Sequence, residues 1–246
     1  MAKPVFKLEL GQETDVLQKL FDLVNRTFPR QLPAHKSGGV IYTRIMLVFL
    51  CRLLEIVNTI LYSLQNLKPY PITVITASVR CLFEMHLNAK YISLQPHEYS
   101  LQYLQYYDAF LLKHQNNIRA AMGQISDTPE LVEALSHQVQ MAVSDNTSSN
   151  DKWSKKNIRE MAKEADELLE YTLDYPILCA YVHGNVVGSI DYIDFAQGAF
   201  GVRNTEDEML RGWLTSRAAQ YFSCFLLTFS KEFELMLEDD ILQCWK

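Results

Sequence analysis

Glycine and proline are scarce in this sequence of 246 residues, which has 9 glycines and 8 prolines. An all-β or α/β architecture of this length needs more of these residues for its turns. Segments in which polar and apolar residues alternate are also rare, whereas apolar residues recur at spacings of three and four. Both observations favour long helices.

Positive charge is in short supply as well. The chain has 23 Lys and Arg residues against 29 Asp and Glu residues, which gives a formal net charge of −6. A protein whose main task is to hold duplex nucleic acid without sequence preference usually carries the opposite sign. The acidic balance disfavours that class of protein but leaves room for a local basic pocket.

Several motifs of familiar enzyme classes are missing. The sequence has no Gly-rich phosphate loop, no P-loop and no Gly-x-Ser-x-Gly nucleophile motif. It also lacks the Glu-x-x-His motif that di-iron helical bundles carry on two helices. Glu55, Glu84 and His183 would form a poor set of metal ligands. We therefore expect neither a metal nor a cofactor.

The five cysteines do not resemble a disulfide framework or a zinc site. Their number is odd, and no two of them form a Cys-x-x-Cys pair. Four lie in apolar helical stretches, as buried free thiols do in a reducing compartment. The amino-terminal segment also lacks the continuous apolar run of a secretory signal peptide. These features predict a cytoplasmic protein.

One apolar window, residues 45–64, is long enough to cross a membrane. It carries Arg52 and Glu55 near its middle, and each of these charges is expensive in lipid. We therefore interpret the window as a buried core helix and expect no membrane association.

The sequence predicts an all-α fold, a bundle of about seven to eight long helices in a single domain over residues 1–246. The polar segment "SDNTSSND" predicts a flexible loop near 144–151 inside that domain. The expected helices cover residues 13–28, 40–66, 71–93, 97–122, 128–143, 154–168, 170–187 and 205–238.

The third expected helix carries Arg80 and Glu84, four residues apart and therefore on the same face. Their neighbours are apolar, so the pair is expected to be partly buried. A structural ion pair is one interpretation. The other is a functional pair, because burial offsets most of the stability that such a pair would give. Asn88 follows on the same stripe, and with Asn185 it is a predicted binding residue.

A second stripe consists of Tyr171, Tyr175, Cys179 and His183, spaced at four-residue steps in the segment 170–187. An imidazole is the natural acid–base group near neutral pH, so His183 is a candidate catalytic residue. A core histidine bonded to a tyrosine is the alternative. Tyr171 and Cys179 are candidate binding residues. A nucleophilic role for Cys179 is disfavoured because it lies in mid-helix.

The fourth expected helix is rich in tyrosine. Tyr99, Tyr103, Tyr106 and Tyr107 could form a surface on which nucleic-acid bases stack. Tyrosines at helical spacing more often form the amphipathic lining of a core, and we favour that interpretation.

Two motifs in this order resemble a known family. The segment "SVRCLFEMHLNAKYI" contains Arg-x-x-x-Glu, and after Trp153 the chain reads Tyr-x3-Tyr-x3-Cys-x3-His-Gly. The combination resembles a family of uncharacterised all-helical prokaryotic proteins, a domain of unknown function, over residues 40–235. The family pattern usually has serine where this chain has Cys179, which further weakens a nucleophilic role at that position.

The arrangement is also similar, more loosely, to the HEPN superfamily of helical ribonucleases. These proteins carry Arg-x(4–6)-His on one helix, act without metal and are usually dimers. Arg80 and His86 fit the spacing, but six positions turn a helix by roughly 240°, so the two side chains would diverge. The sequence leaves open whether the functional histidine is His86 or His183.

The HEPN resemblance implies a metal-independent endoribonuclease of a bacterial defence or toxin system, with RNA as substrate. His183 would be the general base or acid, and Arg80 would stabilise the phosphorane. Glu84 would orient Arg80, and Tyr175 would hold His183. The resemblance also implies a homodimer, and a regulatory partner protein is a further expectation.

Two alternatives stay open at this point. In one, the chain is a non-catalytic helical module, and the same residues bind a nucleotide, a small ligand or a partner protein. In the other, an Arg–Glu–Tyr–His network only fixes the register of packed helices.

Overall fold

A computed structural model describes most of the chain. The described residues are 11–28, 32–68, 70–106, 154, 156–183, 193–194, 201–202 and 208–246. The predicted helix 128–143 and the predicted loop near 144–151 lie outside these residues, as does the second half of the predicted helix 97–122. The single domain over residues 1–246 stays a prediction.

The fold is all-α, as predicted. The described helices are α1 (Glu13–Thr27), α2 (Gly39–Asn66), α3 (Ile72–Leu94), α6 (Ile158–Glu164), α7 (Leu168–Leu173), α8 (Tyr175–Val182), α10 (Glu208–Glu232) and α11 (Glu238–Gln243). Residues 96–106 are also helical. Two short strands, β1 (Ile193–Asp194) and β2 (Gly201–Val202), pair antiparallel.

Two predicted helices are shorter than expected because capping and backbone conformation end them. Asn157 and Glu160 form a capping box, which starts α6 at residue 158 instead of 154. Asp166 has φ 57°, a left-handed conformation that separates α6 from α7. Glu234 and Met236, with φ 55° and 57°, likewise separate α10 from α11. The segments 154–168 and 205–238 are therefore not continuous helices.

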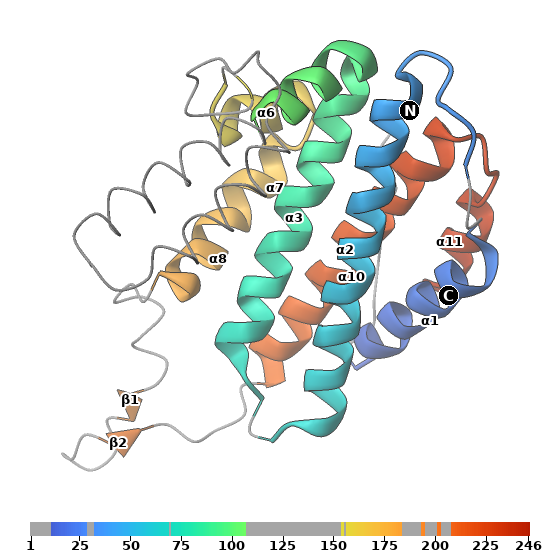
Figure 1. The fold of residues 1–246 in the computed structure, drawn as a ribbon. Coiled ribbons are helices and arrows are strands. Elements are labelled where there is room, and N and C mark those ends of the chain that lie inside the picture. The colour runs from blue at the N-terminus through green and yellow to red at the C-terminus, as the bar shows by residue number, and fades with distance from the viewer. Residues whose placement is uncertain are drawn as a thin grey trace, which may run out of the picture.

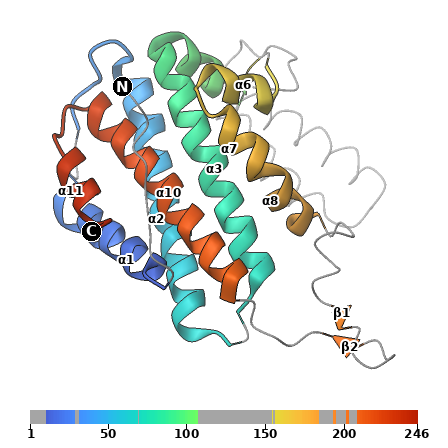
Figure 2. The same cartoon turned by 180° about the vertical axis from the view of Figure 1, so that it is seen from behind.

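The core lies between α1, α2, α3 and α10, which pack side by side (Figures 1 and 2). α10 contributes Phe222, Phe225 and Phe229, whose spacing of three and four places them on one buried face. Full burial of a phenylalanine stabilises a fold by about 1.5–3 kcal/mol. These rings therefore anchor α10 to its neighbours.

α2 is the one described helix that is long and apolar enough to cross a membrane. One side packs into the core through Phe49, Leu53 and Val57. The other side exposes Arg52 and Glu55. The two charges thus lie on the surface of a helix whose opposite face is buried, which fits the interpretation of a core helix.

α6, α7 and α8 form a layer beside α3, on the side away from α1 (Figures 1 and 2). The layer packs against α3 through α6 and α8. The segment 170–187 was expected to be one helix, but it divides at Asp174, and Pro176 occupies the first turn of α8. This layer carries the second predicted stripe of site residues.

The cysteines differ from expectation. Cys51 and Cys81 are exposed, and the other three are half-buried, although all five are free thiols. The prediction of buried thiols is therefore wrong. In such helices the apolar pattern of the sequence does not distinguish a cysteine on the core side from one on the exposed side.

Candidate functional site

Arg80 and Glu84 form an ion pair on α3, with Arg80 Nε 2.9 Å from Glu84 Oε1. The spacing of four residues brings the two side chains together on one face of the helix. The side chain of Arg80 is 20% exposed and that of Glu84 is 33% exposed. The pair is thus partly buried, but solvent reaches it.

Two residues of α8 meet this pair. Arg80 Nη2 donates to the Tyr175 hydroxyl at 3.3 Å, and that hydroxyl donates to Glu84 Oε1 at 2.8 Å. Arg80 Nη1 lies 2.9 Å from His183 Nε2. His183 is exposed at the carboxyl end of α8. The structure therefore brings together Arg80, Glu84, Tyr175 and His183, the four residues predicted to be catalytic.

The contact between Arg80 and His183 determines which nitrogen of the imidazole carries the proton. A guanidinium has five N–H donors and no acceptor, so His183 Nε2 must be the acceptor. An imidazolium could not accept this bond, and its charge would repel the guanidinium. In this arrangement His183 is therefore neutral, with its proton on Nδ1.

Arg80 and Tyr175 have shifted pKa values. Burial alone would lower the pKa of Arg80, but the hydrogen bond and the charge of Glu84 raise it above its usual value. Burial, followed by the hydrogen bond and charge of Glu84, raises the pKa of Tyr175 well above its usual range. Arg80 is thus always a cation, and Tyr175 is a neutral phenol that donates to Glu84.

The predicted role of Tyr175 differs from what the structure shows. Tyr175 was expected to hold His183, but its hydroxyl contacts Glu84 and Arg80 instead. The physical reason is the four-residue step along α8: Tyr175 is two turns before His183, so Arg80 lies between them. Arg80, and not the tyrosine, is the residue that orients the histidine.

The predicted binding residues lie at different distances from this cluster. The Tyr171 ring stacks on Tyr175 with centroids 5.2 Å apart and an interplanar angle of 23°. Cys179 is half-buried, one turn from both Tyr175 and His183 on α8. Asn88 is half-buried on α3, and no side-chain hydrogen bond of it is found among the described residues. Asn185 lies outside them.

The other candidate histidine, His86, points elsewhere. It is 1% exposed, and its Nε2 lies 3.3 Å from Glu167 Oε1. That oxygen also forms an ion pair with Lys90. Burial alone would raise the pKa of Glu167, but the hydrogen bonds and charges of His86 and Lys90 lower it far below its usual value. The histidine that meets Arg80 is therefore His183.

A second buried carboxylate fixes the start of α8. Tyr221 of α10 donates to Asp174 Oδ2 at 2.5 Å, and Arg217 Nε lies 3.3 Å from the same oxygen. Glu167 and Asp174 flank α7, so each end of this helix is tied to a longer one. Sequence reasoning missed both carboxylates. The one signal in the sequence is an acidic residue next to the apolar run of α8.

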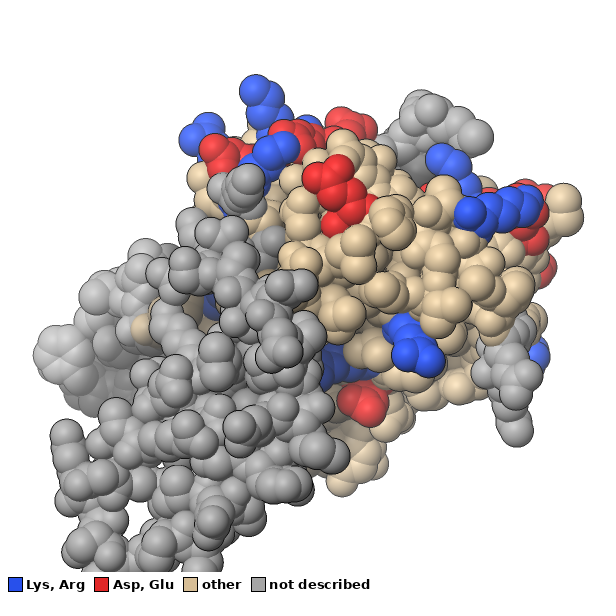
Figure 3. All heavy atoms as spheres, turned by 45° about the horizontal axis from the view of Figure 1, so that its top comes forward, with Lys and Arg blue, Asp and Glu red and all other residues tan. Residues whose placement is uncertain are grey.

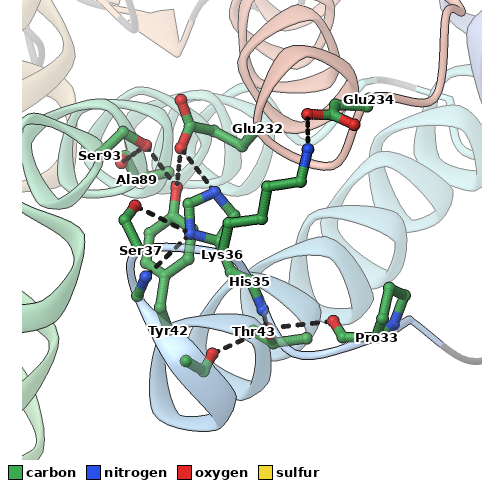
Figure 4. A network of polar contacts seen from close by, with 12 residues as sticks. Pro33, His35, Lys36, Ser37, Tyr42, Thr43, Ala89, Ser93, Glu232 and Glu234 are labelled. Carbon is green, nitrogen blue, oxygen red and sulfur yellow. Dashed lines mark hydrogen bonds and ion pairs between the residues drawn. The ribbon is translucent and has the colours of Figure 1, made fainter.

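Another polar cluster joins one end of α2, α3 and α10 (Figure 4). Glu232 Oε2 accepts from Tyr42 at 3.0 Å and lies 3.4 Å from His35 Nε2. His35 Nδ1 accepts from the backbone N–H of Gly38 at 3.0 Å. Both ring nitrogens of His35 are therefore engaged within the protein. The cluster connects the segment before α2 to the ends of other helices. Neither ring nitrogen of His35 is left over to act as a base.

Two tyrosines of residues 96–106, Tyr99 and Tyr103, pack against the core. Tyr99 stacks on Tyr91 with centroids 4.8 Å apart, and Tyr103 meets Phe49 edge-on at 5.5 Å. These contacts agree with the core interpretation for Tyr99 and Tyr103. Tyr107 lies outside the described residues.

Charged side chains on one face of the molecule do not form a patch of single sign. Figure 3 shows Lys and Arg interspersed with Asp and Glu across this face, with uncharged surface among them. In the part of the chain that the structure describes, no group of three or more His, Cys, Asp and Glu residues could hold a metal ion.

A comparison with protein families matches this chain to a family of unknown function. The model of "Family of unknown function (DUF5677)" covers residues 43–200, which is more than half of the chain. This range includes the four residues of the Arg80 cluster. Neither the curated proteins nor the solved structures contain a significant match.

Proposed function

Because the chain belongs to DUF5677, a family of unknown function, we propose its activity from the site: a metal-independent endoribonuclease of the HEPN kind. Arg80, Glu84, Tyr175 and His183 would form its active centre. The observation that carries this proposal is the distance of 2.9 Å between Arg80 Nη1 and His183 Nε2. It places a permanent cation beside a neutral imidazole.

The pairing suits the cleavage of a phosphodiester. His183 would take the proton from the ribose 2′-hydroxyl, and the 2′ oxygen would form a bond to phosphorus. The bond from phosphorus to the 5′ oxygen would break, and this oxygen would take a proton from solvent. The products would be a 2′,3′-cyclic phosphate and a 5′-hydroxyl end. General base catalysis of this kind contributes typically about 10²–10⁴-fold to a rate.

Arg80 would stabilise the negative charge that develops on the phosphorane. A fixed donor aimed at developing charge contributes on the order of 10²–10³-fold to kcat. Glu84 would hold the guanidinium through Nε, and Tyr175 would limit its rotation through Nη2. Both contacts are visible in the free site at 2.9 and 3.3 Å, so the cation is oriented before any substrate arrives.

Several finer points belong to the same proposal. We infer that the protein acts in the bacterial cytoplasm, within a defence or toxin system, as a homodimer under the control of a partner protein. These points follow from the likeness to HEPN ribonucleases. Light scattering on the pure protein would test the dimer, and growth after induced expression would test the toxicity.

The activity itself is tested by incubating the pure protein with total RNA in EDTA. Cleavage is expected in the wild type and should be lost in His183→Ala. His97→Ala is the matched control, because His97 is exposed on another helix and should cleave as the wild type does. Cleavage that survives in His183→Ala would refute the proposed site.

A second candidate is a non-catalytic module that binds a nucleotide or another small ligand. The stack of Tyr171 on Tyr175 next to the Arg80 guanidinium favours it, because the guanidinium Cζ lies 5.4 Å from the centroid of the Tyr175 ring. If RNA stays intact while a mononucleotide raises the melting temperature, this candidate replaces the nuclease. If His183→Ala changes only the melting temperature, the network is structural.

A further inference from the structure

The basic nitrogen of the candidate site is occupied in the free protein. His183 Nε2 accepts a hydrogen bond from Arg80 Nη1 at 2.9 Å. The other ring nitrogen, Nδ1, carries the proton and therefore cannot accept a second one from a hydroxyl. We propose that Arg80 masks His183 until a phosphodiester anion takes over Nη1 and so exposes the base. This inference rests on the proposed function, and it names a phosphodiester as the ligand that switches the site on.

The contacts of Arg80 divide into two that hold it and one that can be exchanged. Nε donates a hydrogen bond to Glu84, and Nη2 donates one to Tyr175. Both hydrogen bonds are partly buried between α3 and α8. Nη1 alone reaches the exposed His183. An anion arriving from solvent can therefore replace the imidazole at Nη1 while the other two bonds keep the guanidinium in place.

The exchange is favourable because the acceptors differ in charge. A hydrogen bond from a guanidinium to an anionic oxygen is roughly twice as strong as a bond between neutral groups. His183 offers Arg80 a neutral nitrogen, whereas a phosphodiester offers two anionic oxygens. Arg80 also has two N–H groups, one on Nη1 and one on Nη2, beyond the three that make the contacts above. The ligand can use these as well.

Ligand binding should therefore change the hydrogen bonding of His183 Nε2 and not its protonation. The charged and titratable groups near it are Arg80 and Glu84 from α3 and Tyr175 and Cys179 from α8. In the free protein the guanidinium opposes an imidazolium. Once the anion takes over Nη1, His183 Nε2 loses its donor and keeps its lone pair, so this nitrogen can accept the 2′-hydroxyl proton of a substrate.

Nitrogen-15 NMR of histidine-labelled protein tests the masking directly. The probe is thymidylyl-thymidine, which has the phosphodiester but no 2′-hydroxyl and so cannot be cleaved by this chemistry. In the free protein, His183 should show an unprotonated, hydrogen-bonded Nε2. Saturation with the probe at the same pH should leave Nε2 unprotonated and shift its signal to that of a nitrogen without the hydrogen bond from Arg80. The signal is assigned from its loss in His183→Gln, and the signals of His86 and His97 should not change.

Two controls separate masking from general electrostatics. The uncharged methylphosphonate analogue of the probe should leave the His183 signal unchanged. Arg80→Gln removes the donor and the cation, so its free-state His183 signal should already differ from that of the wild type. Should Arg80→Gln fail to fold, the wild-type titration decides alone. A free protein with its proton on Nε2, a probe that binds without changing the signal, or a probe that does not bind would each overturn the proposal.

This experiment is distinguishable from the test of the nuclease. A probe that releases His183 Nε2 from Arg80 while RNA stays intact supports the masking and refutes the catalytic proposal. RNA cleavage that depends on His183, with a free-state Nε2 that carries its own proton, supports the nuclease and refutes the masking.

Discussion

Tyr175 donates its phenolic proton to Glu84 Oε1, the same oxygen that accepts the Nε–H of Arg80, with distances of 2.8 and 2.9 Å. One carboxylate oxygen thus joins α8 to the ion pair of α3. The three side chains form a closed triangle, because Arg80 Nη2 also donates to the Tyr175 hydroxyl. Any change to one side chain alters the partners of the other two.

Tyr175→Phe should loosen this triangle without removing the ring that stacks on Tyr171. We expect a loss of about 1 kcal/mol in the free energy of unfolding, the typical net value of one hydrogen bond. RNA cleavage should fall by about tenfold, because Arg80 loses one of its two positioning contacts. Chemical denaturation and single-turnover cleavage measure the two effects. Tyr171→Phe, which keeps the stack, is the control and should match the wild type in both.

Glu84→Gln should separate stability from activity. The ion pair is partly exposed, so its loss should change the free energy of unfolding by less than about 1 kcal/mol. Cleavage should fall by about tenfold or more, because the guanidinium loses its charged anchor. Glu55→Gln, at an exposed position of α2, provides the control. Equal cleavage by Glu84→Gln and the control would remove Glu84 from the active centre.

The third prediction concerns acid. The pKa of Glu167 is lowered in the folded protein, so this carboxylate stabilises the fold above its unfolded pKa of about 4.5. That stabilisation is lost as the pH falls towards the lower folded pKa. Glu167→Gln should unfold more easily at pH 7, by about 3 kcal/mol, since His86 and Lys90 lose a buried partner. The gap from the wild type should shrink below pH 4.5, as denaturant titrations at several pH values would reveal.

Asp174 should behave in the opposite way. Burial raises its pKa more than the Tyr221 hydrogen bond and the Arg217 charge lower it. A carboxyl with a raised folded pKa stabilises the fold below its unfolded pKa of about 3.8, and this contribution is lost as the pH rises through the folded pKa. Asp174→Asn should therefore gain stability relative to the wild type between pH 3 and pH 7. A variant that becomes relatively less stable over that range would contradict the sign.

Two glycines at separate positions, Gly38 and Gly212, give a prediction about packing. A Cβ added to Gly38 would lie 2.5 Å from Tyr42 Cβ, whereas one added to Gly212 of α10 would meet its nearest neighbour, Glu13 Oε1, at 3.4 Å. Gly38→Ala should cost about 1–3 kcal/mol of the free energy of unfolding, because Tyr42 must move. Gly212→Ala should leave the stability equal or raise it by up to about 1 kcal/mol. Thermal denaturation of the two variants checks both signs.

The spacing within one helix made the Arg80–Glu84 contact predictable, because four residues fix the relative direction of two side chains on an α-helix. The convergence on His183 follows from packing between α3 and α8. The motif order gave a reason to expect it, but no local rule could place the two residues together. The same spacing rule correctly warned that Arg80 and His86 would diverge.

The anchors of α7 could not be predicted from the sequence. The partners of Glu167 lie on α3, and those of Asp174 lie on α10, 43 and more positions away along the chain. The sequence of a helical segment does not show whether a single carboxylate in it is solvated or buried. The break at Asp174 could have been predicted from the sequence, since Pro176 favours the first turn of a new helix. The apolar periodicity across the break concealed it.

The α6–α8 layer supplies Tyr175 and His183, whereas the central helices supply Arg80 and Glu84. Apart from its hydrophobic contacts and the contacts of the Arg80 cluster, the layer is held by the buried carboxylates Glu167 and Asp174. Such a peripheral unit can open while the remaining helices keep their amide protons protected from exchange with deuterium. A subglobal opening of this kind would pull the two halves of the site apart. Heat or mild urea would then abolish the activity of the site well before the melting transition of the central helices.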